Sequence, residues 1–275
     1  DAVVVSPEGC MPQYVKLLSN APESTALFLR CVGAPTLDCG RQTSEAPHSV
    51  WKSIEPLVPR LKGIAGLSEV ERPALERWAR AAGYKGRVVS IPLGATVLPP
   101  TGQPRRGVAY LGRPFFSEKG LTMLMEAARK LPAMPFYFAT ARGTELELNI
   151  ELRKRLAEIP NTVATTCGIR WRAALLQQVR IAAVWGKTDW QWLPGTEVRG
   201  AYGVALAGKG TPVEDWNGTG LGYFRDVDHL VDLITKYHAD DTAFFAEATR
   251  QHRAFLAAGL DSVTVGRKLW EWVSG

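Results

Sequence analysis

Cysteine and long apolar runs are scarce in this sequence, and their scarcity excludes several protein classes. The four cysteines, Cys10, Cys31, Cys39 and Cys167, match no zinc-binding or redox spacing. We interpret them as reduced thiols, as in a cytoplasmic protein. No apolar run approaches the roughly 18–20 residues that a membrane-spanning helix needs, and no basic-then-apolar leader is present. The sequence therefore predicts a globular protein without a transmembrane segment.

Two chemical motifs are missing as well. No Gly-x-Gly-x-x-Gly follows the first expected strand, residues 1–5, which argues against a dinucleotide-dependent oxidoreductase. The Asp-x-Asp sequence at Asp226-Val227-Asp228 opens an expected helix and lacks the context of a metal motif. We therefore expect no metal ligands and no required cofactor.

The positive charge is modest and spread along the chain. Lys and Arg number 33 against 27 Asp and Glu, giving a net charge of +6. Residues 1–100 carry +2 of it (11 minus 9) and residues 101–275 carry +4 (22 minus 18). This distribution favours a solvated basic surface over a dedicated nucleic-acid patch. An anionic partner such as DNA, or an anionic membrane face, stays open.

Short apolar runs alternate with helical patterns along most of the sequence. The expected strands are 1–5, 26–32, 63–68, 87–95, 108–111, 134–139, one beginning at 163, and 181–185. The expected helices are 13–19, 53–61, 69–82, 121–131, 146–159, 172–179, 227–237, 242–258 and 262–272. Such alternation predicts an α/β protein with right-handed crossovers and parallel sheets.

The composition also predicts where the domains divide. Residues 1–98 form a small first domain, and the proline-rich residues 99–106 form a semi-rigid linker. Residues 107–258 form a second domain, and the helix within 259–275 packs back toward the first. Arg105 and Arg106 are interpreted as solvated linker residues, with a phosphate contact as the alternative.

The most informative motif is a strand followed by a basic loop and a helix. Strand 108–111 stops at Gly112, Arg113 follows at once, and Lys119 precedes helix 121–131, for which Ser117 is a plausible N-cap. Ligands of parallel sheets bind beyond the carboxyl ends of strands, where helix N-termini attract anions. The two cations therefore predict an anion site.

Two further stretches add to this motif. Strand 87–95 carries Ile91-Pro92-Leu93-Gly94. The stretch Glu197–Val213 contains small residues over 200–208, for which we expect a closely packed helix. Gly210 would follow the end of that helix, and Thr211-Pro212-Val213 would start the next strand.

Taken together, these residues resemble family-4-type retaining glycosyltransferases of the GT-B fold. Gly-Arg-x5-Lys-Gly resembles the start of their second domain, and Ile-Pro-Leu-Gly the crossing between their domains. Their later pattern is Glu-x-Phe-Gly, a second glutamate eight residues after the first, then Ala-x-Ala-x-Gly-Thr-Pro-Val. Glu197 falls on the first glutamate and Ala205 on the second. The resemblance implies two Rossmann-like parallel-sheet domains facing a cleft, the N-terminal one trimmed.

The resemblance also implies roles for individual residues. Arg113 and Lys119 would hold the donor diphosphate, and Glu197 would orient the donor sugar, so these three are the expected catalytic residues. Ala205 stands where the family has a ribose-binding glutamate, and Glu214 is a possible substitute. The expected donor-binding residues are Gly112, Arg113, Lys119, Arg142, Gly143, Glu197, Gly200 and Thr211. On the acceptor side, the family often has a His-Gly pair after a strand of the first domain. Val32-Gly33 stands in that place here, which leaves Gly33 and His48 as the candidate acceptor-side residues.

The implied activity is transfer of a sugar from a nucleotide-diphosphate donor, with UDP favoured over GDP. A retaining, metal-independent reaction is expected. The acceptor could be a saccharide, a lipid, a protein or a modified DNA base. Two alternatives stay open: a catalytically degraded relative that binds a nucleotide or a partner, and a Rossmann-type enzyme of another class, such as an epimerase.

Overall fold

The computed structural model describes residues 2–5, 12–31, 49–112, 116, 120–141, 146–167, 169–185, 193–210 and 220–275. The chain forms two compact units, each built on its own sheet. The first comprises Asp1–Leu93 with Val263–Gly275, and the second comprises Gly94–Ser262. The divisions thus fall after residues 93 and 262, where the sequence predicts residues 98 and 258.

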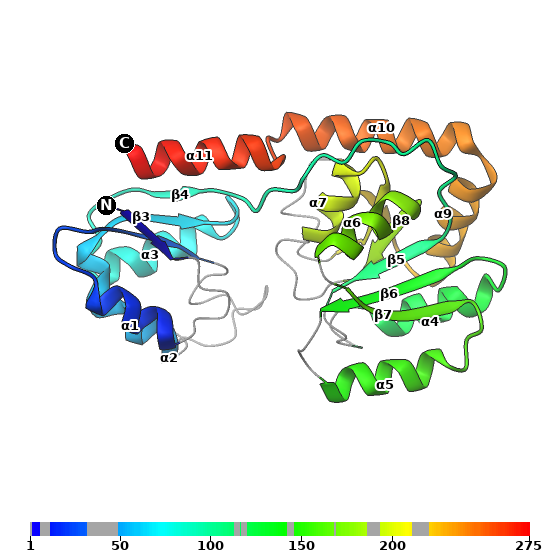
Figure 1. The fold of residues 1–275 in the computed structure, drawn as a ribbon, viewed down its shortest axis with the longest axis horizontal. Helices are drawn as coiled ribbons and strands as arrows, with labels where there is room; N and C mark the ends of the chain where they lie inside the picture. The colour runs from blue at the N-terminus through cyan, green and yellow to red at the C-terminus, as the bar shows by residue number, and fades with distance from the viewer. Residues whose placement is uncertain are drawn as a thin grey trace. The chain divides into compact units, whose positions relative to one another are not determined.

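The first unit is a four-stranded parallel sheet with the order β1-β2-β3-β4 (Figure 1). Two prolines, Pro56 and Pro59, turn the helix predicted over 53–61 into a short α-helix followed by a 3-10 segment. The elements are β1 (Ala2–Val5), α1 (Pro12–Asn20), β2 (Ala26–Arg30), α2 (Ser49–Ile54), η1 (Glu55–Arg60), β3 (Leu61–Gly66), α3 (Arg72–Ala81), β4 (Val88–Ser90) and α11 (Ser262–Ser274).

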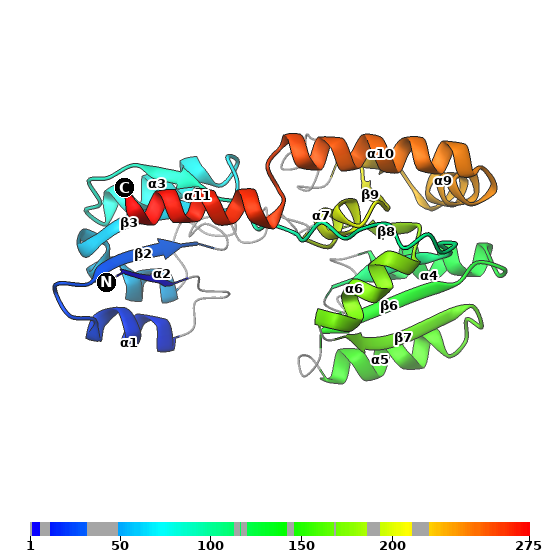
Figure 2. The same cartoon turned by 45° about the horizontal axis from the view of Figure 1, so that its top comes forward.

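The C-terminal helix α11 packs on this sheet, although it follows the second unit in sequence. Val265 joins Ala65 in a small buried cluster, and the Trp272 ring meets Phe28 edge-on at 5.0 Å. Gly63 makes this approach possible, because a Cβ there would lie 2.8 Å from the Trp272 ring. Figure 2 shows α11 running along the strands of the first unit.

The second unit is a six-stranded parallel sheet with the order β10-β9-β8-β5-β6-β7. Strands β5, β8 and β9 are buried along their whole length, as expected for a parallel sheet covered on both faces. The elements are β5 (Val108–Leu111), α4 (Leu121–Lys130), β6 (Phe136–Ala141), α5 (Leu146–Leu156), β7 (Thr162–Cys167), α6 (Ile169–Gln178), β8 (Ile181–Val184), α7 (Leu193–Gly200), β9 (Val204–Gly208), β10 (Gly222–Phe224), α9 (Val227–Ala239) and α10 (Asp241–Ala257).

The strand order reverses between β5 and β8. From β5 the chain moves outward to β6 and β7, then returns to place β8 on the other side of β5. Loops on the two sides of such a reversal lead away from each other, which leaves room for a ligand beyond the carboxyl ends of the strands. This switch point is therefore the first place in the second unit to look for a site.

The predicted helix over residues 200–208 is wrong. Helix α7 ends at Gly200, Tyr202 adopts a positive φ of 56°, and Val204 begins β9, which pairs with β8. The small residues here belong to a buried strand and allow close packing. A Cβ on Gly208 would lie 2.5 Å from the Trp185 ring. The composition correctly indicated close packing, but it could not distinguish a helix from a strand.

The segment between the two sheets is more ordered than a solvated linker. Leu98 donates its N–H to Gly200 O at 3.0 Å, and Arg106 donates its N–H to Gln178 O at 2.8 Å. Arg105 is only 8% exposed. The chain therefore packs along the second unit before it enters β5, and the interpretation of Arg105 as a solvated residue is wrong.

Candidate functional site

The end of β5 forms one side of the switch point. Gly112 follows the strand and donates its N–H to Ala139 O at 3.1 Å, which extends the pairing with β6 by one residue. Gly112 thus lies at the carboxyl edge of the sheet. Arg113 and Lys119, the cations predicted to hold the diphosphate, lie outside the described residues.

Helix α4 begins at the same edge. Its N-cap is Gly120, with a φ of 67°, rather than Ser117, which lies outside the described residues. A Cβ on Gly120 would lie 2.4 Å from the Cβ of Trp185, the residue after β8. A glycine is therefore required for both backbone conformation and contact, and it brings the start of α4 against the end of β8.

Glu197 lies on α7 and is paired with Arg172 of α6. Arg172 Nε donates to Glu197 Oε2 at 2.7 Å, and a second guanidinium nitrogen pairs with the same oxygen. The exposed fractions of the two side chains are 22% for Glu197 and 27% for Arg172. Burial raises the pKa of Glu197, whereas the charge and the hydrogen bond of Arg172 act to lower it. The net effect is a pKa above the ordinary value of a glutamate, so Arg172 offsets only part of the cost of burying this carboxylate.

Sequence reasoning did not identify Arg172 as part of the site. It lies 25 residues from Glu197 and belongs to no recognised motif. Helices α6 and α7 come before and after β8, and each starts on the carboxyl side of the sheet because all strands are parallel. Both residues lie within the first five of their helices. The available signal was one unassigned arginine in the first turns of a predicted helix.

Gly200 has a packing role at the end of α7. It is buried, and a Cβ there would lie 2.7 Å from Thr96 O. Its carbonyl accepts the hydrogen bond from Leu98. Its contacts in the structure are thus with the segment that leads into the second unit, and a donor contact at Gly200 stays a prediction.

Ala205 lies inside the second sheet, on the strand next to the edge strand β10. It is fully buried in β9, and Gln251 bonds both its N–H, at 2.8 Å, and its carbonyl, at 3.1 Å. A glutamate at this position would be buried among apolar strands. The assignment of Ala205 to the place of the family's ribose-binding glutamate is therefore wrong.

The remaining predicted site residues lie outside the described parts of the chain. Among the donor-binding candidates these are Arg142, Gly143 and Thr211, and the proposed substitute Glu214 joins them. The acceptor-side candidates Gly33 and His48 lie there too. In the described ranges, no three His, Cys, Asp or Glu side chains gather into a possible metal site.

No family model matches the sequence, and no curated protein matches it either. Solved structures do match. S. aureus TarM superposes with a TM-score of 0.73 at 11% identity, over 100% of this chain and 55% of its own. Anabaena HepE, solved with UDP and glucose, gives 0.71 at 14% identity, over 96% and 81%. The fold is that of the GT-B glycosyltransferases.

A further GT-B structure extends the comparison. A UDP-forming trehalose-phosphate synthase from Burkholderia xenovorans gives a TM-score of 0.68 at 13% identity, over 100% of this chain and 74% of its own. This chain therefore spans little more than half the length of TarM and about three quarters of the synthase. At identities of 11–14% the likeness establishes the fold alone.

Proposed function

We propose that the protein is a glycosyltransferase that moves a sugar from a nucleotide-diphosphate donor, UDP-linked rather than GDP-linked, to an acceptor. The observation that carries the proposal is the switch point of a GT-B second domain. There the start of α4 meets the end of β8, and a half-buried Glu197–Arg172 pair lies on the helices before and after β8. Anabaena HepE and the synthase, which share the fold, are described with UDP.

The observed strand boundaries change the role that we propose for Glu197. In the family pattern, the second glutamate stands seven residues before the Pro-Val that begins the next strand. Glu197 stands seven residues before Val204, the first residue of β9. We therefore align Glu197 with the second glutamate and propose that it binds the ribose hydroxyls of the donor. Asp189, eight residues earlier, then takes the place of the sugar-side acid and lies outside the described residues.

The chemistry of sugar transfer suits the residues at this edge. Breaking the bond between the sugar C1 and the diphosphate oxygen leaves negative charge on the diphosphate. Arg113, Lys119 and the amino end of α4 would stabilise that charge without a metal ion. The acceptor hydroxyl would attack C1 on the leaving-group face, and its proton would pass to the departing phosphate oxygen. This route retains the anomeric configuration.

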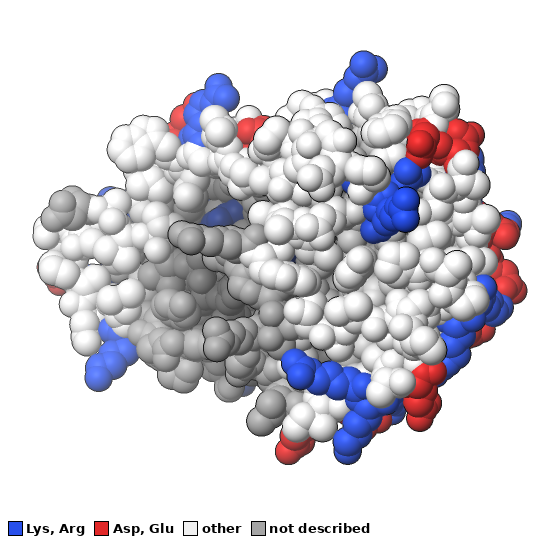
Figure 3. All heavy atoms as spheres, turned by 45° about the vertical axis from the view of Figure 1, so that its right-hand side comes forward, with Lys and Arg blue, Asp and Glu red and all other residues white. Residues whose placement is uncertain are grey.

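The acceptor is not identified, and the described surface favours no single class. Figure 3 shows Lys and Arg interspersed with Asp and Glu on the described part of one face, rather than gathered in one patch. No helix among the described residues is long and apolar enough to cross a membrane. Saccharides, lipid carriers, proteins and modified DNA bases all remain in the set to be screened.

The direct test is donor hydrolysis with water as the acceptor. UDP-glucose, UDP-N-acetylglucosamine and GDP-mannose are each incubated with the protein, and release of UDP or GDP is followed over time. We expect slow release from a UDP-sugar, with the same rate in excess EDTA because Arg113 and Lys119 replace a metal. The Lys119→Ala variant is the matched control for contaminating hydrolases.

Two outcomes would change the proposal. Tight UDP binding by calorimetry without turnover of any donor would favour the non-catalytic binding module. Ala205 does not support that module, because it lies in a buried strand. Complete loss of turnover in EDTA, restored by Mn²⁺ or Mg²⁺, would contradict the metal-independent mechanism and leave the transferase assignment intact.

A further inference from the structure

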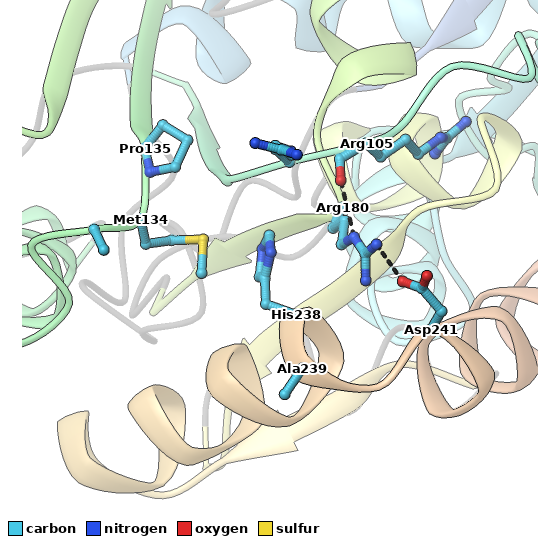
Figure 4. A pocket seen from close by; sticks show the side chains of 9 residues that line it. Arg105, Met134, Pro135, Arg180, His238, Ala239 and Asp241 are labelled. Atoms are coloured by element: carbon cyan, nitrogen blue, oxygen red, sulfur yellow. Dashed lines mark hydrogen bonds and ion pairs between the residues drawn. The ribbon is translucent and has the colours of Figure 1, made fainter.

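A concave site lies on the amino edge of the six-stranded sheet, opposite the edge of the proposed donor site. It has a volume of about 560 Å³, within the range typical of small-molecule pockets. Its walls come from the residues just before β5, β6 and β8 and from the junction of α9 with α10 (Figure 4). These are the amino ends of the strands, so the pocket is distinct from the proposed donor site. The lining residues are Arg105, Arg106, Ala133, Met134, Pro135, Arg180, His238, Ala239 and Asp241.

Positive charge dominates this lining. Arg106 and Arg180 contribute cationic side chains, whereas the side chain of Arg105 runs away from His238 toward Ala201 and its carbonyl faces Arg180 (Figure 4). Asp241 is the one acid among the lining residues. Its side chain is 69% exposed and pairs with Arg180, so water weakens its compensation of the positive charge. The pocket therefore carries a net positive charge.

Backbone contacts hold the arginines in place. Arg180 Nε donates to Arg105 O at 2.9 Å, and another of its nitrogens donates to Tyr237 O at 2.7 Å. Arg105 donates to Ala201 O, while its second terminal nitrogen is buried without a partner among the described residues. The charge of Arg180 is thus fixed before any ligand arrives, which lowers the entropic cost of binding.

The pKa of His238 reflects its burial and the charges around the pocket. Its ring rises from α9 between Met134 and Arg180 (Figure 4). Burial lowers the pKa of His238 to about 4, the charges of Arg180 and Arg106 add to this effect, and the Gly107 backbone opposes it. Its Nε2 atom is buried and has no hydrogen-bond partner among the described residues. The ring is therefore neutral at pH 7, and an anion bound nearby would favour its protonation.

We propose that this pocket binds a small organic phosphate, at a site separate from the nucleotide-sugar site. Guanidinium groups match the oxygens of a phosphate in both charge and geometry. The volume suits a small molecule, and Met134 and Pro135 offer an apolar wall for its organic part. A nucleic-acid strand would instead depend on cations spread over the exposed surface.

The test follows the His238 ring by NMR, because that signal is local to the pocket. The four histidines of the chain are observed in a non-phosphate buffer at constant ionic strength, and His238→Gln assigns the resonance. Inorganic phosphate and phenyl phosphate are titrated separately, with and without saturating UDP. We expect saturable shifts of His238 in both conditions, a rise in its pKa, and tighter binding of phenyl phosphate because of the apolar wall.

Matched variants distinguish phosphate binding in this pocket from nonspecific attraction of anions to the protein. Arg106→Gln removes an exposed cation of the pocket, and Arg153→Gln removes an exposed cation on α5, outside it. We expect Arg106→Gln to weaken phosphate binding about tenfold or more, and Arg153→Gln to leave it unchanged. Equal weakening by both variants, or the same His238 shift with chloride alone, would overturn the proposal. So would stronger competition by a short oligonucleotide than by phenyl phosphate.

Discussion

Charged side chains are arranged differently at the two edges of the second sheet. At the carboxyl edge, a half-buried carboxylate has a dedicated cation, because Arg172 donates to Glu197. At the amino edge, Arg180 pairs with the exposed Asp241, Arg106 belongs to the same lining, and burial together with these cations lowers the pKa of His238 to about 4. The described residues thus include a paired carboxylate at the first edge and more cations than acids around the pocket at the second.

This difference shows why charge totals say little about sites. The net charge of +6 is spread evenly enough to predict only a basic surface. Folding nevertheless gathers Arg105, Arg106 and Arg180 around one pocket, although 74 residues separate Arg106 from Arg180 (180 minus 106). The amino ends of parallel strands meet at one edge, so residues that precede different strands become neighbours.

The largest expected effect concerns the two cations that we propose hold the donor diphosphate. We expect Arg113→Ala and Lys119→Ala each to lower kcat about 100- to 1000-fold, because each removes a preorganised charge from the developing phosphate charge. Thermal unfolding should change little. UDP release from the preferred donor is the measurement, and Arg153→Ala is the control. Wild-type turnover in either variant would contradict the assignment of that residue to the diphosphate. It would not affect the proposal for the amino-edge pocket.

A smaller effect should follow from separating the buried pair. If Glu197 binds ribose, Glu197→Gln should weaken UDP binding by about 10- to 100-fold, since a hydrogen bond to a charged group is lost. Arg172→Gln should weaken it too, by releasing the carboxylate from its position. Calorimetric titration with UDP measures both effects.

A double-mutant cycle sharpens this second test. The combined Glu197→Gln and Arg172→Gln variant should lose less than the sum of the two single losses, because the residues act as a unit. Unchanged UDP affinity with a large drop in kcat for Glu197→Gln would instead support the role first predicted for Glu197, that of orienting the donor sugar. Additive losses would mean that Arg172 acts on the donor independently of Glu197.

The smallest expected effect is the acid sensitivity of the amino edge. The pKa of His238 is about 4 in the folded protein and about 6.5 in an unfolded chain. Between these values the unfolded chain binds the additional proton, so folding stability falls as the pH drops through this window. We expect about 1–2 kcal/mol of this loss between pH 7 and pH 5.

Urea denaturation at the two pH values measures this loss. His238→Gln should lose less stability than the wild type between pH 7 and pH 5, whatever its stability at pH 7. Added phenyl phosphate should also reduce the loss in the wild type, because a bound anion favours the protonated ring. An identical pH dependence in wild type and variant would show that His238 is not held in its neutral form.

Much of the fold was accessible from the sequence. The alternation of buried runs with helical patterns predicted the parallel α/β units, since side-chain periodicity differs between strand and helix. The strand 108–111 and the helix that follows it were confirmed almost to the residue. The misassigned stretch was 200–208, where small residues give no periodicity and satisfy the packing of a helix or a strand equally well.

The sequence by itself determined the architecture and the candidate cations of the carboxyl edge, because these depend on local periodicity and on a short motif. Only the tertiary structure decided that Arg172 holds Glu197, that Ala205 lies within a sheet, and that Arg105 is buried beside a basic pocket. The physical reason is the same in each case. These properties arise from contacts between segments far apart in the chain, and local patterns carry no information about which segments become neighbours.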